Sequence, residues 1–288
     1  MHRTLRTASV SVDDIVDSYW KFLSRNYYDA HLKRFKDRLS ADPKAAEAEA
    51  VVFSVLWSAQ LRPDIFEDNS AGGPDFRCEP SPDGAFLVEV KSLDSEAISA
   101  RSALPLTING AGGQAFGLIT DKLCSAAQSK ASQLGGRGMS GVLAIASSHA
   151  FAGLLMDRGA AEYLMTSAPH ISVPIGSTRK AGQWQTDLRN AVFCQPAAIL
   201  DASGNQAFVT RYRSIAAILL VTIGVRETDV VGLLHPDAAH PFNPVLFPAV
   251  PYVRFAEWPL TGTNISTEWI LGGDAPRGAA TFEHRRIA

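Results

Sequence analysis

Residues 72–93 read GGPDFRC-EPSPDG-AFLVEVKSL, and this stretch decides the fold that we expect. The segment Phe86–Ser92 is continuously apolar at its start and alternates only at its far end, which predicts a strand buried on both faces at first. Glu89 and Lys91 are two residues apart, so their side chains emerge on one face. Turn residues precede this strand, and Phe76–Glu79 can form another strand before them, so the two together predict a β-hairpin.

Asp75 stands at the start of the first strand, and the twist of a hairpin can bring it beside Glu89 on the second. Two carboxylates close together repel each other, which is costly unless a cation lies between them. Their oxygen atoms suit Mg²⁺ or Mn²⁺ rather than zinc. Lys91 adds an ammonium that can hold an attacking water or neutralise charge on a phosphate oxygen. These residue types indicate metal-assisted hydrolysis of a phosphodiester.

Pro74-Asp75, followed fourteen residues later by Glu89-Val90-Lys91, resembles the PD-(D/E)XK motif of the restriction-endonuclease-like nucleases. The resemblance implies an α/β fold with a mixed sheet flanked by helices, and a nuclease that cleaves DNA with Mg²⁺ or Mn²⁺. It implies that Asp75 and Glu89 hold the metal and that Lys91 positions water and stabilises the pentacovalent oxygens. The alternative for the same residues is an exposed hairpin with a Glu/Lys pair on its solvated face.

Asp42-Pro43 predicts the start of a helix that runs to about Gln60, with the aspartate as its cap. Glu49 lies on the apolar, core-facing stripe of this helix, where a carboxylate is costly without a partner. Glu47 lies on a less buried face. Because a helix before the hairpin commonly donates one more carboxylate in this superfamily, the resemblance implies Glu49, or else Glu47, as a further catalytic residue. The alternative is a pair of surface glutamates on an alanine-rich helix.

The segment from Val12 to about Leu39 has apolar residues at roughly helical spacing and predicts one long or broken amphipathic helix, capped by Ser11 or Asp13. Its aromatic side chains belong either to the core or to a homodimer contact. The region is also locally basic, and its cationic residues are Lys21, Arg25, Lys33, Arg34, Lys36 and Arg38.

After the hairpin, residues 92–113 are small and polar and predict a loop or short helix near the substrate. A helix over residues 114–134 follows and ends at Gly135-Gly136. Gln128 and Lys130 stand off its apolar stripe, and the resemblance implies that polar residues of this helix can touch the phosphodiester. The alternative is that both are ordinary solvated residues of the helix. Residues 141–147 form an apolar run of strand length, so the order strand, helix, strand predicts a parallel crossover.

The second half of the chain predicts a helix over 150–165, a short strand over 170–175, a hairpin of 191–200 with 206–212, and strands over 214–224 and 229–234, of which the first can also be a helix. Arg179 and Lys180 beside Trp184 are typical either of a nucleic-acid contact or of an ordinary surface loop. His235 and His240 lie in a turn-rich loop without a third ligand. Residues 258–288 are polar and glycine-rich and predict a surface tail.

Composition restricts the class of protein and its cellular compartment. The chain has 288 residues, a net charge of −2 and three isolated cysteines, which argue against a disulfide framework and favour a reducing cytoplasm. No signal pattern or bilayer-spanning run is present, so we expect a cytoplasmic protein without a membrane partner. The near-neutral charge gives no support to nucleic-acid binding, although a local basic patch is compatible with it.

The sequence therefore predicts an N-terminal helical segment at 1–40, a nuclease core at 41–150 and a C-terminal extension packed on that core at 151–288. The expected partner is nucleic acid, DNA above all. The rival interpretations are a catalytically inactive module of the same fold that serves binding or assembly, and a nuclease that acts on RNA.

Overall fold

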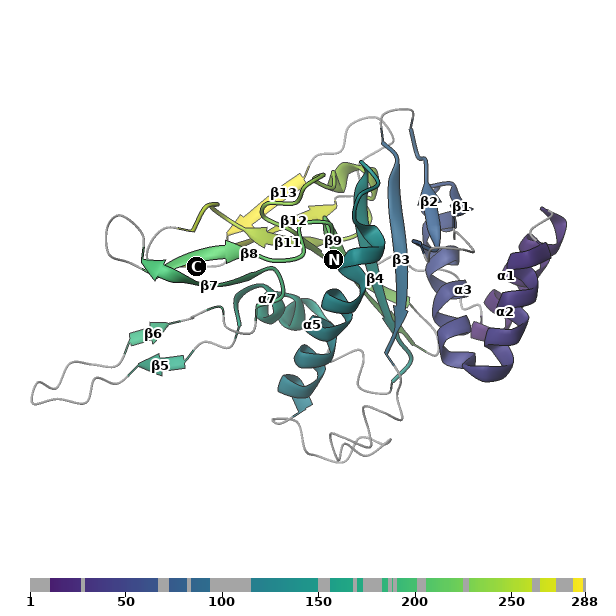
Figure 1. Cartoon of the computed structure of the whole chain (residues 1–288), viewed down its shortest axis with the longest axis horizontal. Helices are drawn as coiled ribbons and strands as arrows, with labels where there is room; N and C mark the ends of the chain where they lie inside the picture. Colours follow the sequence, from purple (N-terminus) through teal and green to yellow (C-terminus); the bar gives the residue numbers. More distant parts are fainter. Residues whose placement is uncertain are drawn as a thin grey trace, which may run out of the picture.

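The computed structural model describes residues 11–26, 29–66, 73–81, 84–93, 115–149, 156–167, 170–172, 183–185, 188, 191–200, 206–224, 228–260, 265–272 and 282–286. These residues form an α/β fold, in which a large mixed sheet is flanked by helices (Figure 1). The predicted loop over 92–113 and the cationic pair Arg179 and Lys180 fall almost wholly outside the described residues.

Within the described residues, the main sheet has nine strands in the order β1-β2-β3-β4-β9-β10-β11-β12-β13. The strands are β1 Pro63–Ile65, β2 Phe76–Cys78, β3 Phe86–Ser92, β4 Ser140–Ser147, β9 Ala217–Ile223, β10 Thr228–Leu234, β11 Tyr252–Phe255, β12 Thr267–Gly272 and β13 Phe282–Arg286. The pairs β3–β4, β4–β9 and β10–β11 are parallel, and the other neighbours are antiparallel.

The predicted hairpin is confirmed. Strands β2 and β3 pair antiparallel, with Phe76 opposite Val88. Asp75 directly precedes β2, and continuing this register by one residue places it opposite Glu89. Directly opposed residues of an antiparallel pair point to the same face and have Cβ atoms about 5 Å apart. The register of two short strands thus brings two carboxylates together.

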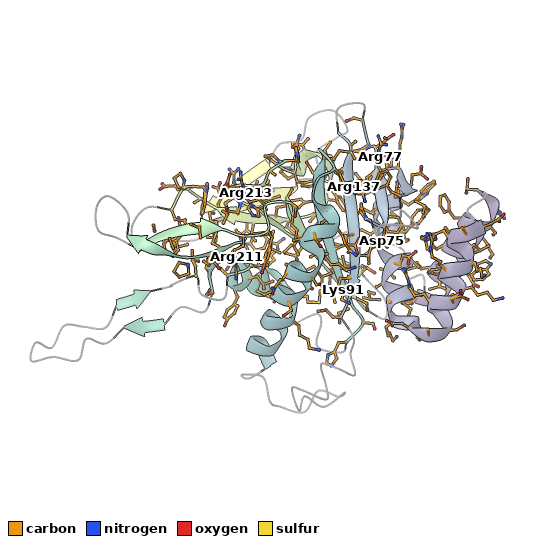
Figure 2. All side chains as sticks on the ribbon, viewed as in Figure 1. Asp75, Arg77, Lys91, Arg137, Arg211 and Arg213 are labelled. Atoms are coloured by element: carbon orange, nitrogen blue, oxygen red, sulfur yellow. The ribbon has the colours of Figure 1, made fainter. Side chains whose placement is uncertain are left out.

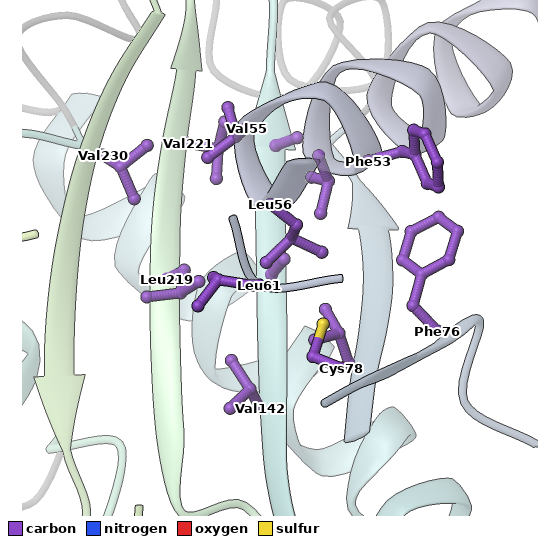
Figure 3. Close-up of a cluster of buried hydrophobic side chains, with 14 of the residues drawn as sticks. Phe53, Val55, Leu56, Leu61, Phe76, Cys78, Val142, Leu219, Val221 and Val230 are labelled. Carbon is purple, nitrogen blue, oxygen red and sulfur yellow. The ribbon is translucent and has the colours of Figure 1, made fainter. Parts of the chain in front are cut away.

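One face of the sheet is covered by α3, Pro43–Ser58, with α1, Val12–Arg25, and α2, Asp29–Ala41, outside it. The predicted caps are present, because the Ser11 side chain accepts a hydrogen bond from Asp14 N–H and the Asp42 side chain accepts one from Ala45 N–H. The core on this face gathers side chains from α3 and from strands β2, β4, β9 and β10 (Figure 3).

The opposite face is covered by α5, Ala115–Leu134, and α7, Arg158–Thr166. Alternation along β4 explains the two layers, since Val142 and Ala144 pack on the α3 side while Leu143 and Ile145 pack on the α5 side. Helix α5 connects the parallel strands β3 and β4, so the predicted crossover is confirmed. Gly136 follows the helix with φ +73°, a conformation that glycine adopts at little cost.

The C-terminal half continues the main sheet, because β9 pairs with β4 and the later strands follow it. The segment predicted as strand or helix at 214–224 is strand β9. The second predicted hairpin, of residues 191–200 with 206–212, is present as β7, Cys194–Leu200, and β8, Gln206–Thr210. A further small sheet joins β5, His170–Ser172, to β6, Gln183–Gln185.

One sequence-based prediction needs correction. Residues 258–288 are not simply a polar surface tail, because β12 pairs with β11 and buries Trp269 and Ile270, and β13 pairs with β12. The N-terminal segment, predicted as one long or broken helix, is broken, since α1 ends where the Asn26 backbone N–H and side-chain amide both donate to Phe22 O. In the part of the chain that the structure describes, no helix is long and apolar enough to cross a membrane.

Candidate active site

A cavity of about 270 Å³ opens where α2, α3, β3 and α5 meet, and we call it the acidic cavity. Figure 2 shows two of its residues, Asp75 and Lys91, on the part of the sheet between α3 and α5. All four side chains predicted for the site line it. The described lining residues are Arg38, Asp42, Ala45, Glu49, Gly73, Asp75, Glu89, Val90, Lys91, Ser92, Lys130 and Gln133.

Asp75 is buried and retains 7% exposure. Its Oδ2 accepts a hydrogen bond of 2.7 Å from the backbone N–H of Val90, which fixes the carboxylate against the edge of β3. Burial raises the pKa of Asp75 well above its usual value, and the negative charges of Glu89 and Glu49 raise it further. The Val90 hydrogen bond and Arg38 act in the opposite direction. The balance means that this carboxylate favours a positive partner or a proton.

Glu89 is almost completely buried, with its Oε1 atom 2.5 Å from the ammonium nitrogen of Lys130. Lys130 comes from α5, on the other side of the cavity, and is 22% exposed. The sequence left Lys130 open between a contact with the phosphodiester and an ordinary solvated position, and in the structure its ammonium contacts Glu89. Lys91, two residues after Glu89, is exposed and lines the same cavity.

Glu49 is buried on α3, as its place on the apolar stripe predicted. Its Oε1 lies 2.9 Å from the Tyr19 hydroxyl, which donates a hydrogen bond, and 2.9 Å from His31 Nε2. Its Oε2 accepts from the Arg38 guanidinium. Helices α1 and α2 therefore meet α3 through this one carboxylate. Glu47 lies elsewhere, where it pairs with Lys44 at 2.7 Å and does not line the cavity.

Arg38 and Gln133 line the cavity and were not predicted as site residues. Gln133 Oε1 is buried with no hydrogen-bond partner among the described residues. A signal for Gln133 was available, because it lies three residues after Lys130 and so shares its helix face. Arg38 stood in a basic run without any mark that set it apart. Gln128, for which the sequence left both a phosphodiester contact and an ordinary solvated position open, is exposed and does not line the cavity.

The donor set fits a small hard cation. Among the described residues, no group of three or more His, Cys, Asp or Glu side chains is arranged to hold a metal. Magnesium, however, is commonly bound through one or two protein carboxylates, with water and substrate phosphate completing its shell. Asp75 and Glu89 supply that number. Burial first, and then the charge of Glu89, raise the pKa of Asp75, and a cation between two such carboxylates reduces their repulsion. The described lining residues include no Cys or His, the side chains that most often bind zinc.

Comparisons with protein-family models, with curated proteins and with solved structures give no match to this chain. The functional conclusion therefore depends on the cavity and its residues.

Proposed function

We propose that this protein is a metal-dependent nuclease that hydrolyses phosphodiester bonds of DNA, built on a restriction-endonuclease-like core. The observation that carries the proposal is the shared acidic cavity, which Asp75 lines from the residue before β2 and which Glu89 and Lys91 line from β3. The order helix, hairpin, helix, parallel strand over residues 43–147 agrees with the core order of that superfamily. Buried acids beside cations, in one polar cavity, suit a phosphate bound through a metal.

Asp75 and Glu89 would hold Mg²⁺ or Mn²⁺. Such an ion supplies Lewis-acid polarisation of the phosphate and a more acidic bound water. The hairpin register contributes the alignment of the two carboxylates, and the Val90 N–H holds Asp75 in its rotamer. Glu49, on α3, would complete or orient the shell of the metal. Its own oxygen atoms are held by Tyr19, His31 and Arg38.

The cationic residues of the cavity act on the phosphate and on the attacking water. Lys91 is exposed at the mouth, so its ammonium can hold a water for in-line attack and stabilise the charge that grows on the phosphate oxygens. Arg38 lines the same cavity with a guanidinium that donates to Glu49, and its remaining N–H groups can serve as further donors. Lys130 neutralises Glu89 when no other cation is present, and it can turn to the phosphate when Glu89 takes another partner.

The experiment is a nicking assay on supercoiled plasmid and on single-stranded DNA with Mg²⁺ or with EDTA. We expect cleavage only with the metal, and we expect Asp75→Ala and Lys91→Ala each to lower the rate by about a hundredfold or more. Neither change should lower the melting temperature of the apo-protein. Cleavage that persists in both variants would refute this assignment of the site. Replacing DNA by RNA in the same assay tests the ribonuclease alternative.

A second candidate is a catalytically inactive module of the same fold that binds a partner. The observation that favours it is the Lys130–Glu89 ion pair, because a built-in ammonium beside Glu89 can satisfy the acidic pair permanently. The two candidates differ in their response to Mn²⁺. If Asp75 and Glu89 bind metal, the protein gains thermal stability with rising Mn²⁺ by mass action. If Lys130 neutralises the pair permanently, Mn²⁺ leaves the melting temperature unchanged.

A further inference from the structure

A second cavity, of about 490 Å³, lies between α1 and α3, and we call it the α1–α3 groove. It shares no lining residue with the acidic cavity. Its walls are aromatic and come from Tyr19 and Phe22 of α1 and from Phe53 and Trp57 of α3. Trp57 is 54% exposed, which is unusual for the largest apolar side chain. An indole at the mouth of an aromatic groove indicates a site for a flat ligand.

The groove holds its indole in place. The rings of Phe53 and Trp57 are 5.7 Å apart at 23°, so they are nearly parallel. Phe22 meets the indole edge-on, with 5.5 Å between ring centres and 62° between planes. Contacts of this kind restrict the side chain while much of its surface stays open to solvent. A flat ring that stacks there therefore finds a largely preorganised partner.

The charge of the groove is positive. Lys21 and Arg25 are one helical turn apart on α1, and both are exposed at its edge. The described lining contains no Asp or Glu. Neither cation has an ion-pair partner in the described part of the chain. Aromatic surface beside unpaired cations matches a ligand that carries both a flat ring and a negative group.

The groove and the acidic cavity are lined by neighbouring parts of α3, and a buried hydrogen bond links their walls. Tyr19 forms part of the groove wall, and its hydroxyl donates to Glu49, which lines the acidic cavity. Glu49, Phe53 and Trp57 are spaced four residues apart along α3, so they share one face of that helix. Eight residues span about 12 Å of helix, a distance that a few nucleotides cover at ~3.4 Å each. The spacing of the two cavities along α3 is therefore within the length of a few nucleotides.

We propose that the α1–α3 groove binds a nucleotide of single-stranded DNA, with the base stacked on Trp57 and the phosphate paired with Lys21 and Arg25. The choice of nucleic acid as the occupant rests on the nuclease function proposed above. A base inside a duplex presents no free face to an indole, so the groove selects unpaired strands. Stacking accepts any base, and the groove therefore gives strand selectivity without sequence selectivity.

The first test measures the affinity of a fluorescein-labelled oligothymidylate in EDTA, where no metal-dependent cleavage takes place. Trp57→Ala should weaken binding roughly tenfold to a hundredfold, whereas Trp57→Phe should retain most of the affinity. An abasic oligonucleotide of equal length is the matched probe, and both the unmodified protein and Trp57→Ala should bind it equally weakly. Unchanged affinity of Trp57→Ala for oligothymidylate would overturn the proposal.

The second test measures the salt dependence of the same binding. Each phosphate contact that is lost should reduce the slope of log affinity against log salt by about 0.7 for a single strand. The double variant Lys21→Glu with Arg25→Glu should therefore lower the slope by roughly 1.4 and weaken binding. Lys36→Glu, an exposed change on α2 that lines neither cavity, should leave the slope as it is. An equal slope in the double variant contradicts the phosphate contact.

These measurements separate the groove from the active site. If nicking depends on Asp75 but Trp57→Ala binds oligothymidylate as tightly as the unmodified protein, the groove proposal is wrong and the proposed nuclease function stands. If no nicking occurs but binding in EDTA depends on Trp57, the proposed nuclease function is wrong and binding in the groove stands. Sedimentation of the protein adds one more outcome. A dimer that Trp57→Ala dissociates, without any loss of oligonucleotide binding, would assign the groove to a second copy of the chain and overturn its role in DNA binding.

Discussion

Asp75 combines almost complete burial with two neighbouring carboxylates, Glu89 and Glu49, and both features oppose its ionisation. A protein that needed only stability would place an apolar or amide side chain here. The single backbone hydrogen bond from Val90 does not offset this, because the pKa of Asp75 remains well above its usual value. Retaining a carboxylate at such a position is understandable where the site gains from a cation.

Asp75→Asn should make the metal-free protein more stable at neutral and alkaline pH. The pKa of an aspartate in the unfolded chain is about 3.9. When the native pKa is higher, the protonated acid stabilises the fold fully at a pH below the unfolded pKa. This stabilisation is lost as the pH rises through the native pKa. Asparagine does not ionise and can keep the acceptor for Val90 N–H. We expect a higher melting temperature than that of the unmodified protein at pH 8 in EDTA, with the difference shrinking towards pH 4. Asp64→Asn, an exposed change on β1, is the control.

Lys130→Gln should make the protein more sensitive to metal. Without the ammonium, Glu89 keeps its burial but loses its closest cation, so the apo-protein should lose about 2–4 kcal/mol of stability. The same change removes a positive charge that competes with a divalent ion. The rise in melting temperature on adding Mn²⁺ should therefore be larger than in the unmodified protein. Lys122→Gln on the same helix is the matched control, and an equal Mn²⁺ response in Lys130→Gln would contradict the competition.

Helices α1, α2 and α3 are joined by one buried polar cluster, in which Tyr19, His31 and Arg38 meet Glu49. Each of these groups is costly to bury alone and acceptable when the others are present. The cluster also forms part of the cavity wall, through Glu49 and Arg38. The packing of the N-terminal helices and the shape of the acidic cavity are thereby coupled.

Glu49→Ala should lower the free energy of unfolding by about 3–5 kcal/mol, because it leaves the Arg38 guanidinium and two further polar groups without their acceptor. Glu47→Ala on the same helix removes only a surface pair with Lys44 and should cost about 1 kcal/mol or less. Urea unfolding of both variants provides the measurement. Similar losses in the two variants would show that the Glu49 cluster does not hold the helices.

The loop after β10 has its own pH dependence. Burial lowers the pKa of His235 to about 4, and the neutral ring uses both nitrogens, since Nε2 contacts Arg211 O at 2.7 Å and Nδ1 accepts from Asp237 N–H. The unfolded state binds the proton more tightly, so stability should fall as pH drops from about 6.5 to about 4. His235→Gln should reduce that fall, as measured by urea unfolding at pH 7 and pH 4.5. His240→Gln, at an exposed position, should leave it unchanged.

Local chemistry explains which elements could be predicted. The caps at Ser11 and Asp42 and the hairpin of β2 with β3 depend on neighbours in sequence, and all are present. The break after α1 was less visible, because Asn26 ends the helix through its own amide on Phe22 O rather than through glycine or proline.

At the scale of the whole molecule, the pairing of strands that are distant in the sequence could not be predicted. Strand β11 was not predicted, and β12 and β13 lie in a region that looked like a tail, because a short strand is defined by its partner more than by its own residues. The site shows the same division. Asp75, Glu89 and Lys91 belong to one hairpin and could be grouped from the sequence, whereas Arg38 and Gln133 come from distant helices and join the cavity only in the folded chain.

The most direct measurement is the rate of plasmid nicking as a function of Mn²⁺ concentration, for the unmodified protein and for Asp75→Asn, alongside the melting temperature at each concentration. We predict a saturable rate for the unmodified protein, with half-saturation at the concentration that half-completes its thermal stabilisation, and neither response in Asp75→Asn. Equal nicking by the two proteins, or stabilisation by Mn²⁺ without any nicking, would contradict a nuclease centre at Asp75 and Glu89.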